Sequence, residues 1–172
     1  YVFDSDFINE DQALGEAEKF FGRKLEIRRV IPFSPGRYEE FWIKNCMAVG
    51  LASSFIEPLE STSLFLSIAQ LDTFKQFLNE IRQRDQSSID QFNSIVSENF
   101  DDTLNFVYLH YMTKRKDTEF WANFRENNPP PSNFVNMLEK MRNANFSQFD
   151  AKKGFGIRSY MQVTRSEEHT SE

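Results

Sequence analysis

The hydrophobic pattern of this chain changes its period near residue 62, and this change limits the folds open to it. Before that point, short apolar segments alternate with polar residues, as is typical of β-strands. These segments are "YVF" (1–3), "LEIRRVIPF" (25–33), "YEEFWI" (38–43) and "CMAVG" (46–50). After it, Leu64, Ile68, Leu71, Phe74, Leu78 and Ile81 fall on one helical stripe. Strands followed by helices predict an α+β fold.

Four further segments carry helical signals. Asn9 can cap a helix that runs to Phe21, and Gly22 is a natural stop. The spacing of Ile89, Phe92, Val96, Leu104, Val107 and Tyr111 indicates a second long helix or two shorter ones. A capping signal at Asp117 predicts a short helix, and the prolines before Ser132 predict another from about that residue.

Composition excludes several classes of protein. The chain has 172 residues, of which 40% are hydrophobic, so it can bury a core of its own. Its formal charge of −6, without a basic block, argues against a nucleic-acid partner. We expect no membrane partner, because apolar runs are short. Cys46 is the only cysteine, so neither a disulfide framework nor a thiolate metal site is expected, and a cytoplasmic location fits.

The two ends of the sequence lead to a separate expectation. "RSEEHTSE" (165–172) breaks the apolar pattern before it and resembles a translated sequencing adapter, so we set it apart as a non-native tail. The chain also opens inside an apolar pattern rather than at a methionine. We therefore expect a fragment of a longer protein.

The junction "AVGLASSFIEPLESTSLFL" (48–66) gathers the residues with chemical potential. Gly50 ends a strand pattern and, lacking a side chain, lets a flat ligand approach the backbone. Pro58 sets a turn before Glu60 and a run of hydroxyl residues, and one of Ser61, Thr62 or Ser63 is the expected N-cap. Free amides at such a helix start form an anion site.

Two interpretations of this junction remain open from the residues alone. In the first, the hydroxyl residues are simply helix caps and Glu60 is an acidic residue near a helix start. Alternatively, the amides hold a small anion while Glu60 points away from them toward a second pocket. Glu57 could rival Glu60 as the acidic group, but Glu60 adjoins the hydroxyl run and is preferred. His110 borders the apolar face of the second helix and is expected to be packed or hydrogen-bonded rather than a metal ligand; no metal site is predicted.

The same residues resemble the flavin-dependent tryptophan halogenase family. "FWIKNCMAVGLASSFIEPLESTS" matches a pattern W-x-x-N-C-x-x-x-G-L followed by E-P-L-E-S-T. "YVFDSDFINEDQA" and "LHYMTKRKDTEFW" (109–121) resemble two further family segments, so the likeness covers residues 1–164. It implies that the glycine-rich FAD fingerprint and the catalytic lysine lie upstream of Tyr1. The fragment alone is then expected to be inactive.

The resemblance implies a reaction and a set of roles. In this family reduced FAD, delivered by a partner flavin reductase, reacts with O2 so that chloride or bromide becomes hypohalous acid, which halogenates a small aromatic substrate. By position, Glu60 matches the catalytic glutamate and Ser61 a neighbouring hydroxyl. Thr62 and Ser63 match the halide-binding amides. Gly50, Leu51 and Leu64 match positions whose backbone meets the flavin.

One departure concerns the substrate. Family members that act on free tryptophan usually have Gly where this chain has Ser63, so tryptophan, indole or a similar electron-rich aromatic is expected. The implied organisation is the end of a flavin-monooxygenase-like sheet domain (1–62) followed by a mainly helical, substrate-side region (63–164). A related flavin-dependent hydroxylase is the alternative, although its usual Gly-Asp pair is Gly50-Leu51 here. A second alternative is that the chain is a non-catalytic helical interaction segment.

Overall fold

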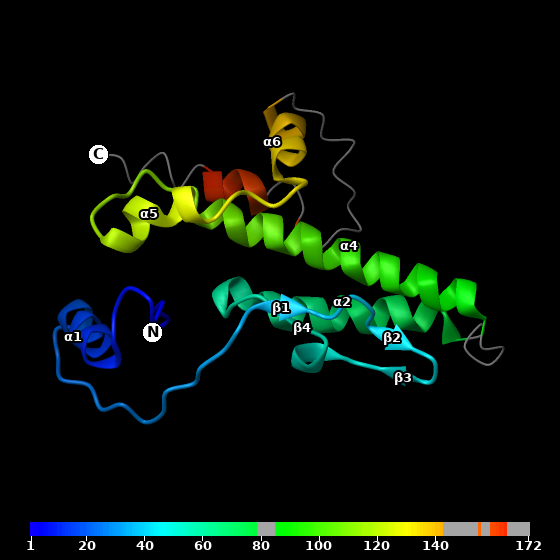
Figure 1. The fold of residues 1–172 in the computed structure, drawn as a ribbon, viewed down its shortest axis with the longest axis horizontal. Helices are drawn as coiled ribbons and strands as arrows, with labels where there is room; N and C mark the ends of the chain where they lie inside the picture. Colours follow the sequence, from blue (N-terminus) through cyan, green and yellow to red (C-terminus); the bar gives the residue numbers. More distant parts are fainter. Residues whose placement is uncertain (79–84, 143–154, 156–158, 165–172) are drawn as a thin grey trace. The chain divides into compact units, whose positions relative to one another are not determined.

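The computed structural model describes residues 1–78, 85–142, 155 and 159–164 (Figure 1). The chain forms two compact units. The larger comprises Ser34–Lys114 and Asn128–Glu172, and the smaller comprises Tyr1–Phe33 and Arg115–Asn127. Helices predominate in the described residues, so the predicted mixture of strand and helix is confirmed in a helix-rich form. The domain boundary after residue 62 stays a prediction, and the proposed tail, 165–172, lies outside the described residues.

The strands of the larger unit are short. Gly36–Arg37 (β1) pairs antiparallel with Ser54–Phe55 (β4), and Trp42–Ile43 (β2) pairs antiparallel with Cys46–Met47 (β3). The predicted break near residues 44 and 45 is the turn of the β2–β3 hairpin, where Lys44 adopts a positive φ of 56°. Within the described part of the chain, these pairs of strands do not confirm a flavin-monooxygenase-like sheet.

Two helices form the framework of the larger unit. Thr62–Gln76 (α2) and Gln86–His110 (α4) pack side by side (Figure 1). The second of them is one continuous helix, which settles the choice between one long helix and two short ones. The Asp85 side chain caps α4 by accepting hydrogen bonds from the amides of Ser87 and Ser88.

The apolar stripe predicted for α2 is mostly not its buried face, although its member Phe74 packs against the core around Phe92. Leu64, Ile68, Leu71 and Leu78 are all exposed. Ile81 lies outside the described residues. The helix instead buries Thr62, Leu66, Gln70, Thr73 and the adjacent Phe77. These residues recur at spacings of three and four, so they form a face of their own. Thr62 and Gln70 donate to carbonyls of the chain before the helix, and Thr73 donates to the Ala69 carbonyl within it.

A buried amide of α4 fixes the β2–β3 hairpin. Asn93 Oδ1 accepts hydrogen bonds from the amides of Phe41 and Trp42 at 3.0 and 2.9 Å, and its Nδ2 donates to the Trp42 carbonyl at 2.9 Å. Phe41 and Trp42 pack with Phe92 and other residues of α4 in a hydrophobic core. Because all of these groups are buried, the hairpin keeps one register against the helix.

The far end of α4 carries a second core. It includes Phe106, Phe134 and Tyr160. Phe134–Arg142 (α6) supplies one of them, which confirms the helix predicted from about Ser132 with a start two residues later. Residues 159–164 are also helical. This core supports the part of α4 that precedes His110.

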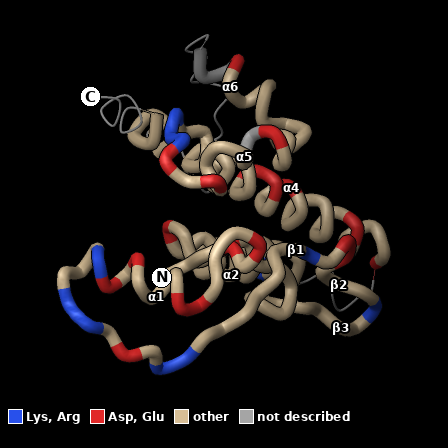
Figure 2. Tube along the Cα trace, turned by 60° about the vertical axis from the view of Figure 1, so that its left-hand side comes forward, with Lys and Arg blue, Asp and Glu red and all other residues tan. Residues whose placement is uncertain are grey.

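Basic positions are distributed over several segments (Figure 2). They include positions within 23–29, the β2–β3 turn and 114–116. Acidic positions include residues 10, 11, 16 and 18 in the smaller unit and several positions of α4 in the larger one. No helix among the described residues is both long and apolar enough to cross a membrane.

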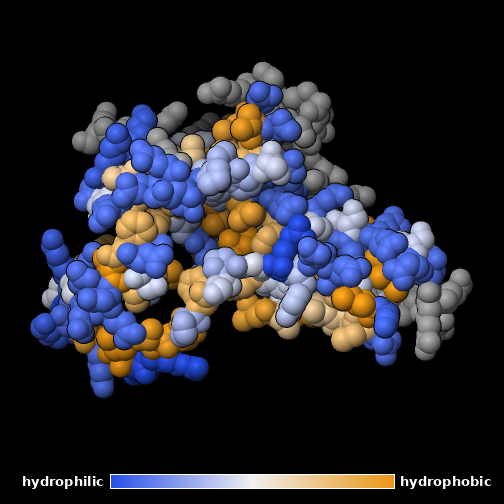
Figure 3. Space-filling view, in the orientation of Figure 1, coloured by the Kyte–Doolittle hydropathy of each residue, from blue (hydrophilic) through white to orange (hydrophobic). Residues whose placement is uncertain are grey.

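In the smaller unit, Glu10–Phe21 (α1) begins and ends as predicted. Asn9 Oδ1 accepts from the Gln12 amide while Gln12 bonds back to the Asn9 amide, a complete capping box. Gly22 closes the helix with a φ of 65°. The predictions of strands at 1–3 and 25–33 are wrong, because neither segment pairs with another strand among the described residues. Apolar side chains of 27–33 are exposed instead (orange in Figure 3).

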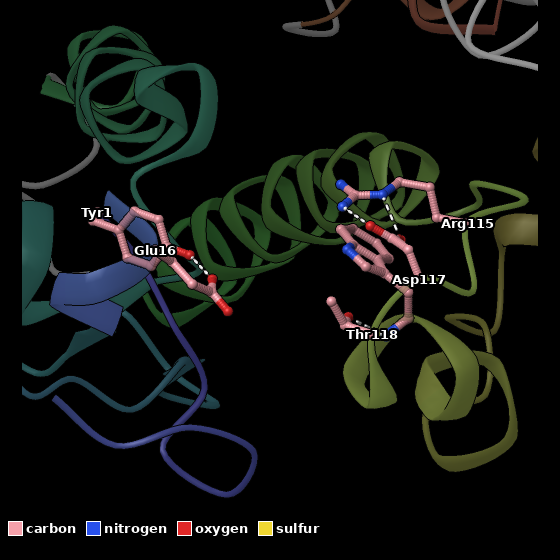
Figure 4. Close-up of polar contacts among 6 residues, drawn as sticks. Tyr1, Glu16, Arg115, Asp117 and Thr118 are labelled. Carbon is pink, nitrogen blue, oxygen red and sulfur yellow. Dashed lines mark hydrogen bonds and ion pairs between the residues drawn. The ribbon is translucent and has the colours of Figure 1, made fainter. Parts of the chain in front are cut away.

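Glu119–Asn127 (α5) confirms the short helix predicted after Asp117. Figure 4 shows how its start is ordered. The Arg115 guanidinium donates two hydrogen bonds to Asp117, at 2.7 and 3.0 Å, and lies over the Trp121 ring. The Trp121 amide donates to Thr118 Oγ1. The hydrogen bond from Arg115 also lowers the pKa of Asp117.

Candidate functional site

The predicted site centres on residues 57–61, called the acidic loop below, which lead directly into α2. Leu59–Ser61 forms one 3₁₀ turn (η2) after Pro58. Glu60 and Ser61 both have a φ of 55°, in the left-handed region that residues other than glycine rarely adopt. Consecutive left-handed residues store backbone strain, which persists where surrounding contacts fix the loop. The two residues predicted as catalytic are thus the two strained ones.

Contacts from the end of α4 fix this loop. The Tyr111 hydroxyl donates a hydrogen bond to Glu57 Oε2 at 2.5 Å. His110 Nε2 lies 4.0 Å from Glu60 Oε1, an ion-pair distance. His110 is also anchored to its own helix, since Nδ1 lies 2.9 Å from the Phe106 carbonyl oxygen. The predicted hydrogen-bonded state of His110 is confirmed, and its contact with Glu60 is new.

The two carboxylates differ in their surroundings. Glu57 is half-buried and engaged by Tyr111, whereas the Glu60 side chain is 56% exposed. Burial is the main reason that the pKa of Tyr111 is raised, and its hydrogen bond to Glu57 adds to the effect. A raised pKa keeps the phenol protonated, so it remains the donor to Glu57. Glu60 is therefore the carboxylate with an open side.

The first turn of α2 follows at once. Ser61 occupies the predicted N-cap position, but its side chain makes no cap hydrogen bond. Thr62 is fully buried, its amide donates to the Leu59 carbonyl and its hydroxyl donates to the Glu57 carbonyl at 3.3 Å. The Ser63 hydroxyl oxygen is buried and finds no hydrogen-bond partner among the described residues. Thr62 thus ties the loop to the helix, while Ser63 offers an unused hydroxyl.

The segment around Gly50 lies against the same helix. Gly50 begins a 3₁₀ turn, Gly50–Ala52 (η1), with a φ of 64°, and a Cβ there would lie 3.4 Å from Ser67 Oγ. A side chain at this position would therefore be strained by the backbone angle and would crowd α2. The sequence predicts a strand that ends at Gly50. The strand β3 ends earlier, at Met47, and Gly50 begins the turn that follows.

Gln70 of α2 holds this turn in place. Its Nε2 donates to the Ala48 carbonyl at 2.7 Å, and Ser53 Oγ lies 3.3 Å from its Oε1 and 2.7 Å from the Gly50 carbonyl oxygen. Gln70 and Ser53 are 2% and 3% exposed, so these are buried bonds. Leu51 and Leu64, by contrast, are 71% and 63% exposed. The turn therefore exposes the Leu51 side chain from a fixed backbone, and the first turn of α2 exposes Leu64.

The structure thus gathers Glu60, Ser61, Thr62 and Ser63 at the start of α2, with Gly50 against the next turn of that helix. Sequence reasoning did not foresee the partners of these residues, namely His110, Tyr111 and Gln70. The first two stand in the segment "LHY", whose resemblance to a family segment was the available signal. Gln70 offered none, because a glutamine within a helical pattern is usually exposed. Among the described residues, no group of three or more His, Cys, Asp or Glu side chains could hold a metal ion.

The chain is similar to known proteins in both sequence and fold. The family model described as tryptophan halogenase matches residues 1–172. Tryptophan 7-halogenase KtzQ of Kutzneria sp. (strain 744) is 34% identical over 136 residues, which are 73% of this chain and 24% of that protein. Tryptophan 6-halogenase ThaL of Streptomyces albogriseolus is 33% identical over 129 residues, with the same coverage.

A solved structure extends the likeness to the fold. BrvH, a flavin-dependent halogenase from Brevundimonas sp. BAL3, superposes with a TM-score of 0.77 at 34% identity, over 94% of this chain and 33% of its own. The chain spans about a quarter of the length of the curated relatives it matches. Matched along its whole length by the family model, the chain belongs to the tryptophan halogenase family.

Proposed function

We propose that this chain is the segment of a flavin-dependent halogenase that supplies its catalytic carboxylate and its halide-binding turn. The substrate is an electron-rich aromatic such as tryptophan or indole, and the halide is chloride or bromide. One observation carries the proposal: the strained Glu60 and Ser61 directly precede a helix start at which the buried Ser63 hydroxyl has no hydrogen-bond partner in the described part of the chain. A strained loop with an open carboxylate beside an anion site suits halogen transfer.

The first turn of α2 is the proposed halide site. Ser63 fits a halide, because its buried hydroxyl has a hydrogen to donate and its amide lies in the first turn, where the helix dipole favours an anion. Thr62 contributes differently. Its amide already donates to the Leu59 carbonyl, so it would have to share that bond with the halide. Its main part is to shape the turn through its bond to Glu57.

The surface around Gly50 is the proposed contact with the flavin. Gly50 would meet the flavin through its backbone, while Leu51 and Leu64 expose apolar side chains that a flat ring system can cover. These features fit FAD. Bound in its reduced form, FAD would supply with O2 the oxidising equivalents that convert halide to hypohalous acid. Gln70 and Ser53 hold the turn that faces it.

Glu60 is the proposed base of the halogenation step. In that step the ring carbon forms a bond to the halogen of hypohalous acid, the halogen–oxygen bond breaks, and the oxygen leaves as water after gaining a proton. The ring carbon then loses its own proton, and Glu60 is the acceptor. Ser61 places a second hydroxyl beside this carboxylate, free of any capping bond. The open side of Glu60 supports this assignment, because a base must reach its substrate.

The remaining components are proposed to come from outside this chain. A flavin reductase supplies reduced flavin, and the rest of the halogenase supplies the FAD fingerprint and the catalytic lysine. The present chain by itself is therefore proposed to be inactive. The chain's short span relative to its relatives supports this division.

The test uses a full-length halogenase that carries this segment. The enzyme is incubated with FAD, a flavin reductase, O2 and a panel of indoles and phenols, with chloride or bromide as the halide. Halogenated product detected by mass spectrometry, dependent on halide and on Glu60, supports the proposal. Hydroxylated product in the absence of halide would instead assign the enzyme to the hydroxylases.

A further inference from the structure

The end of α4 contacts both carboxylates of the acidic loop. His110 and Tyr111 are adjacent in sequence, and Glu57 and Glu60 are three residues apart. Tyr111 bonds Glu57, and His110 faces Glu60 at 4.0 Å. Two consecutive residues of one helix end thus hold the two ends of the strained turn between them.

The hydrogen bonds of His110 define what each of its ring nitrogens can do. The Phe106 carbonyl oxygen can only accept, so Nδ1, 2.9 Å away, must carry a hydrogen. Nε2 is then the nitrogen that faces the Glu60 carboxylate, and it carries a hydrogen toward Glu60 in the imidazolium form, the form in which this contact is an ion pair. The ring is also held by an edge-to-face contact with Phe106, whose centroid lies 4.8 Å away. Both contacts with Phe106 fix the direction in which Nε2 points.

We infer that His110 is a positioning residue for Glu60: its Nε2 holds the carboxylate toward the reacting ring, while its Nδ1 anchors the imidazole to α4. This inference deepens the proposed function and rests on it. The Glu60 side chain needs such a partner, because 56% of it is exposed and it could otherwise rotate into solvent. The His110 side chain is only 19% exposed, so it offers a fixed point from which to act.

The contact is not needed to explain stability. An ion pair with one exposed partner contributes little to folding, because water screens it and the side chains lose freedom in forming it. The loop itself is held by Tyr111 and by the Thr62 hydroxyl, which bond other atoms of Glu57. Loss of the His110–Glu60 contact should therefore change catalysis while leaving the fold intact.

Three substitutions at His110 separate its two nitrogens. In His110→Gln the side-chain amide nitrogen occupies the place of Nε2, so the donor toward Glu60 is kept and the bond to Phe106 is lost. In His110→Asn the amide nitrogen occupies the place of Nδ1, so the bond to Phe106 is kept and the donor toward Glu60 is lost. His110→Phe removes both and keeps the ring.

The expected result is a difference in kcat between the amide variants. In the full-length halogenase, His110→Gln should stay within about threefold of the unmodified enzyme, while His110→Asn and His110→Phe lose about tenfold or more, as for a displaced reacting group. The KM for the aromatic substrate and the halide-dependent consumption of reduced flavin should stay unchanged in all three. Equal kcat values for Asn and Gln would overturn the inference, as would parallel losses of kcat and melting temperature.

A second measurement does not depend on turnover. In the same full-length protein labelled with ¹⁵N-histidine, the His110 signals are identified by their disappearance in His110→Gln. Glu60→Gln should then shift the Nε2 resonance of His110 and leave Nδ1 nearly unchanged. An unmoved Nε2 resonance would overturn the positioning role. If the enzyme halogenates no aromatic tested, the proposed function fails, and this spectrum still decides whether His110 faces Glu60.

Discussion

The Tyr111 hydroxyl donates a hydrogen bond of 2.5 Å to Glu57, which joins residues 54 apart in the sequence. It ties the end of the longest described helix to the loop that carries Glu60 and Ser61. The bond leaves Glu60 as the open carboxylate of the pair. Burial and the neighbouring Glu57 both raise the pKa of Tyr111, and this shift leads to a prediction about how stability depends on pH.

A raised pKa makes stability depend on pH at the alkaline end. In the unfolded chain Tyr111 ionises near its ordinary value of 10.0, whereas in the fold it holds its proton to higher pH. Its contribution to the free energy of unfolding is therefore complete below about pH 10 and declines as pH rises further. Urea denaturation of the full-length protein between pH 8 and pH 11 should show this decline. Tyr111→Phe should make the curve flatter, and an unchanged slope would contradict the assignment.

Glu60→Gln should lower halogenation strongly while leaving the oxidation of reduced flavin dependent on halide. An amide cannot accept the ring proton, and loss of a general base costs about 10²-fold or more in rate. The measurement is product formed per reduced flavin consumed. Glu57→Gln is the matched control, because it removes the other carboxylate of the acidic loop, which faces Tyr111. Unchanged turnover in Glu60→Gln would remove Glu60 from the mechanism.

Ser63→Ala should raise the KM for chloride without lowering kcat at saturating halide. The change deletes the buried hydroxyl that lacks a protein partner but keeps the backbone amide. A hydrogen bond to a charged group contributes about 1.5–3 kcal/mol, so an increase of about tenfold or more in KM is expected. Ser67→Ala serves as the control, since that hydroxyl already donates to the Ser63 carbonyl. Equal KM values for Ser63→Ala and the unmodified enzyme would exclude the hydroxyl from the halide site.

Gln70→Leu should destabilise the protein and weaken flavin binding together. Leucine is close to glutamine in size but leaves the buried Ala48 carbonyl without its donor, at a cost of about 1–3 kcal/mol. The turn at Gly50 also loses the contact with Ser53. Gln76→Leu, at an exposed position of the same helix, should change the free energy of unfolding by less than about 0.5 kcal/mol. Denaturation curves measure the free energy of unfolding of the two full-length variants, and flavin titrations measure their affinity for flavin. Equal values for both variants would contradict the role of Gln70.

The present chain, expressed by itself, should retain no flavin. The exposed Leu51 and Leu64 offer one face to the ring system, but a large cofactor needs contacts along its whole length. Absorbance near 450 nm after purification in the presence of FAD measures retention. Flavin bound in a one-to-one ratio would show that this segment holds the cofactor unaided.

Local signals in the sequence were sufficient to predict where several helices begin and end. The capping box at Asn9, the stop at Gly22 and the helix start after Ser61 depend on residues within one turn of each other, so they can be recognised without the fold. The W-x-x-N-C and E-P-L-E-S-T patterns likewise depend only on order along the chain. The residues that these patterns predict as catalytic and halide-binding lie together at the start of a single helix.

Only the tertiary structure decided which faces are buried and which distant residues meet. The sequence suggested that Leu64, Ile68 and Leu71 form the inner stripe of α2, yet that stripe is exposed and the helix buries Gln70. Segment 25–33 has a strand-like pattern but no ladder partner, and without one its alternation cannot form a sheet. The pairing of His110 with Glu60 depends on how α4 packs beside α2. Such long-range packing is set by shape and polar satisfaction across the fold, which no short pattern encodes.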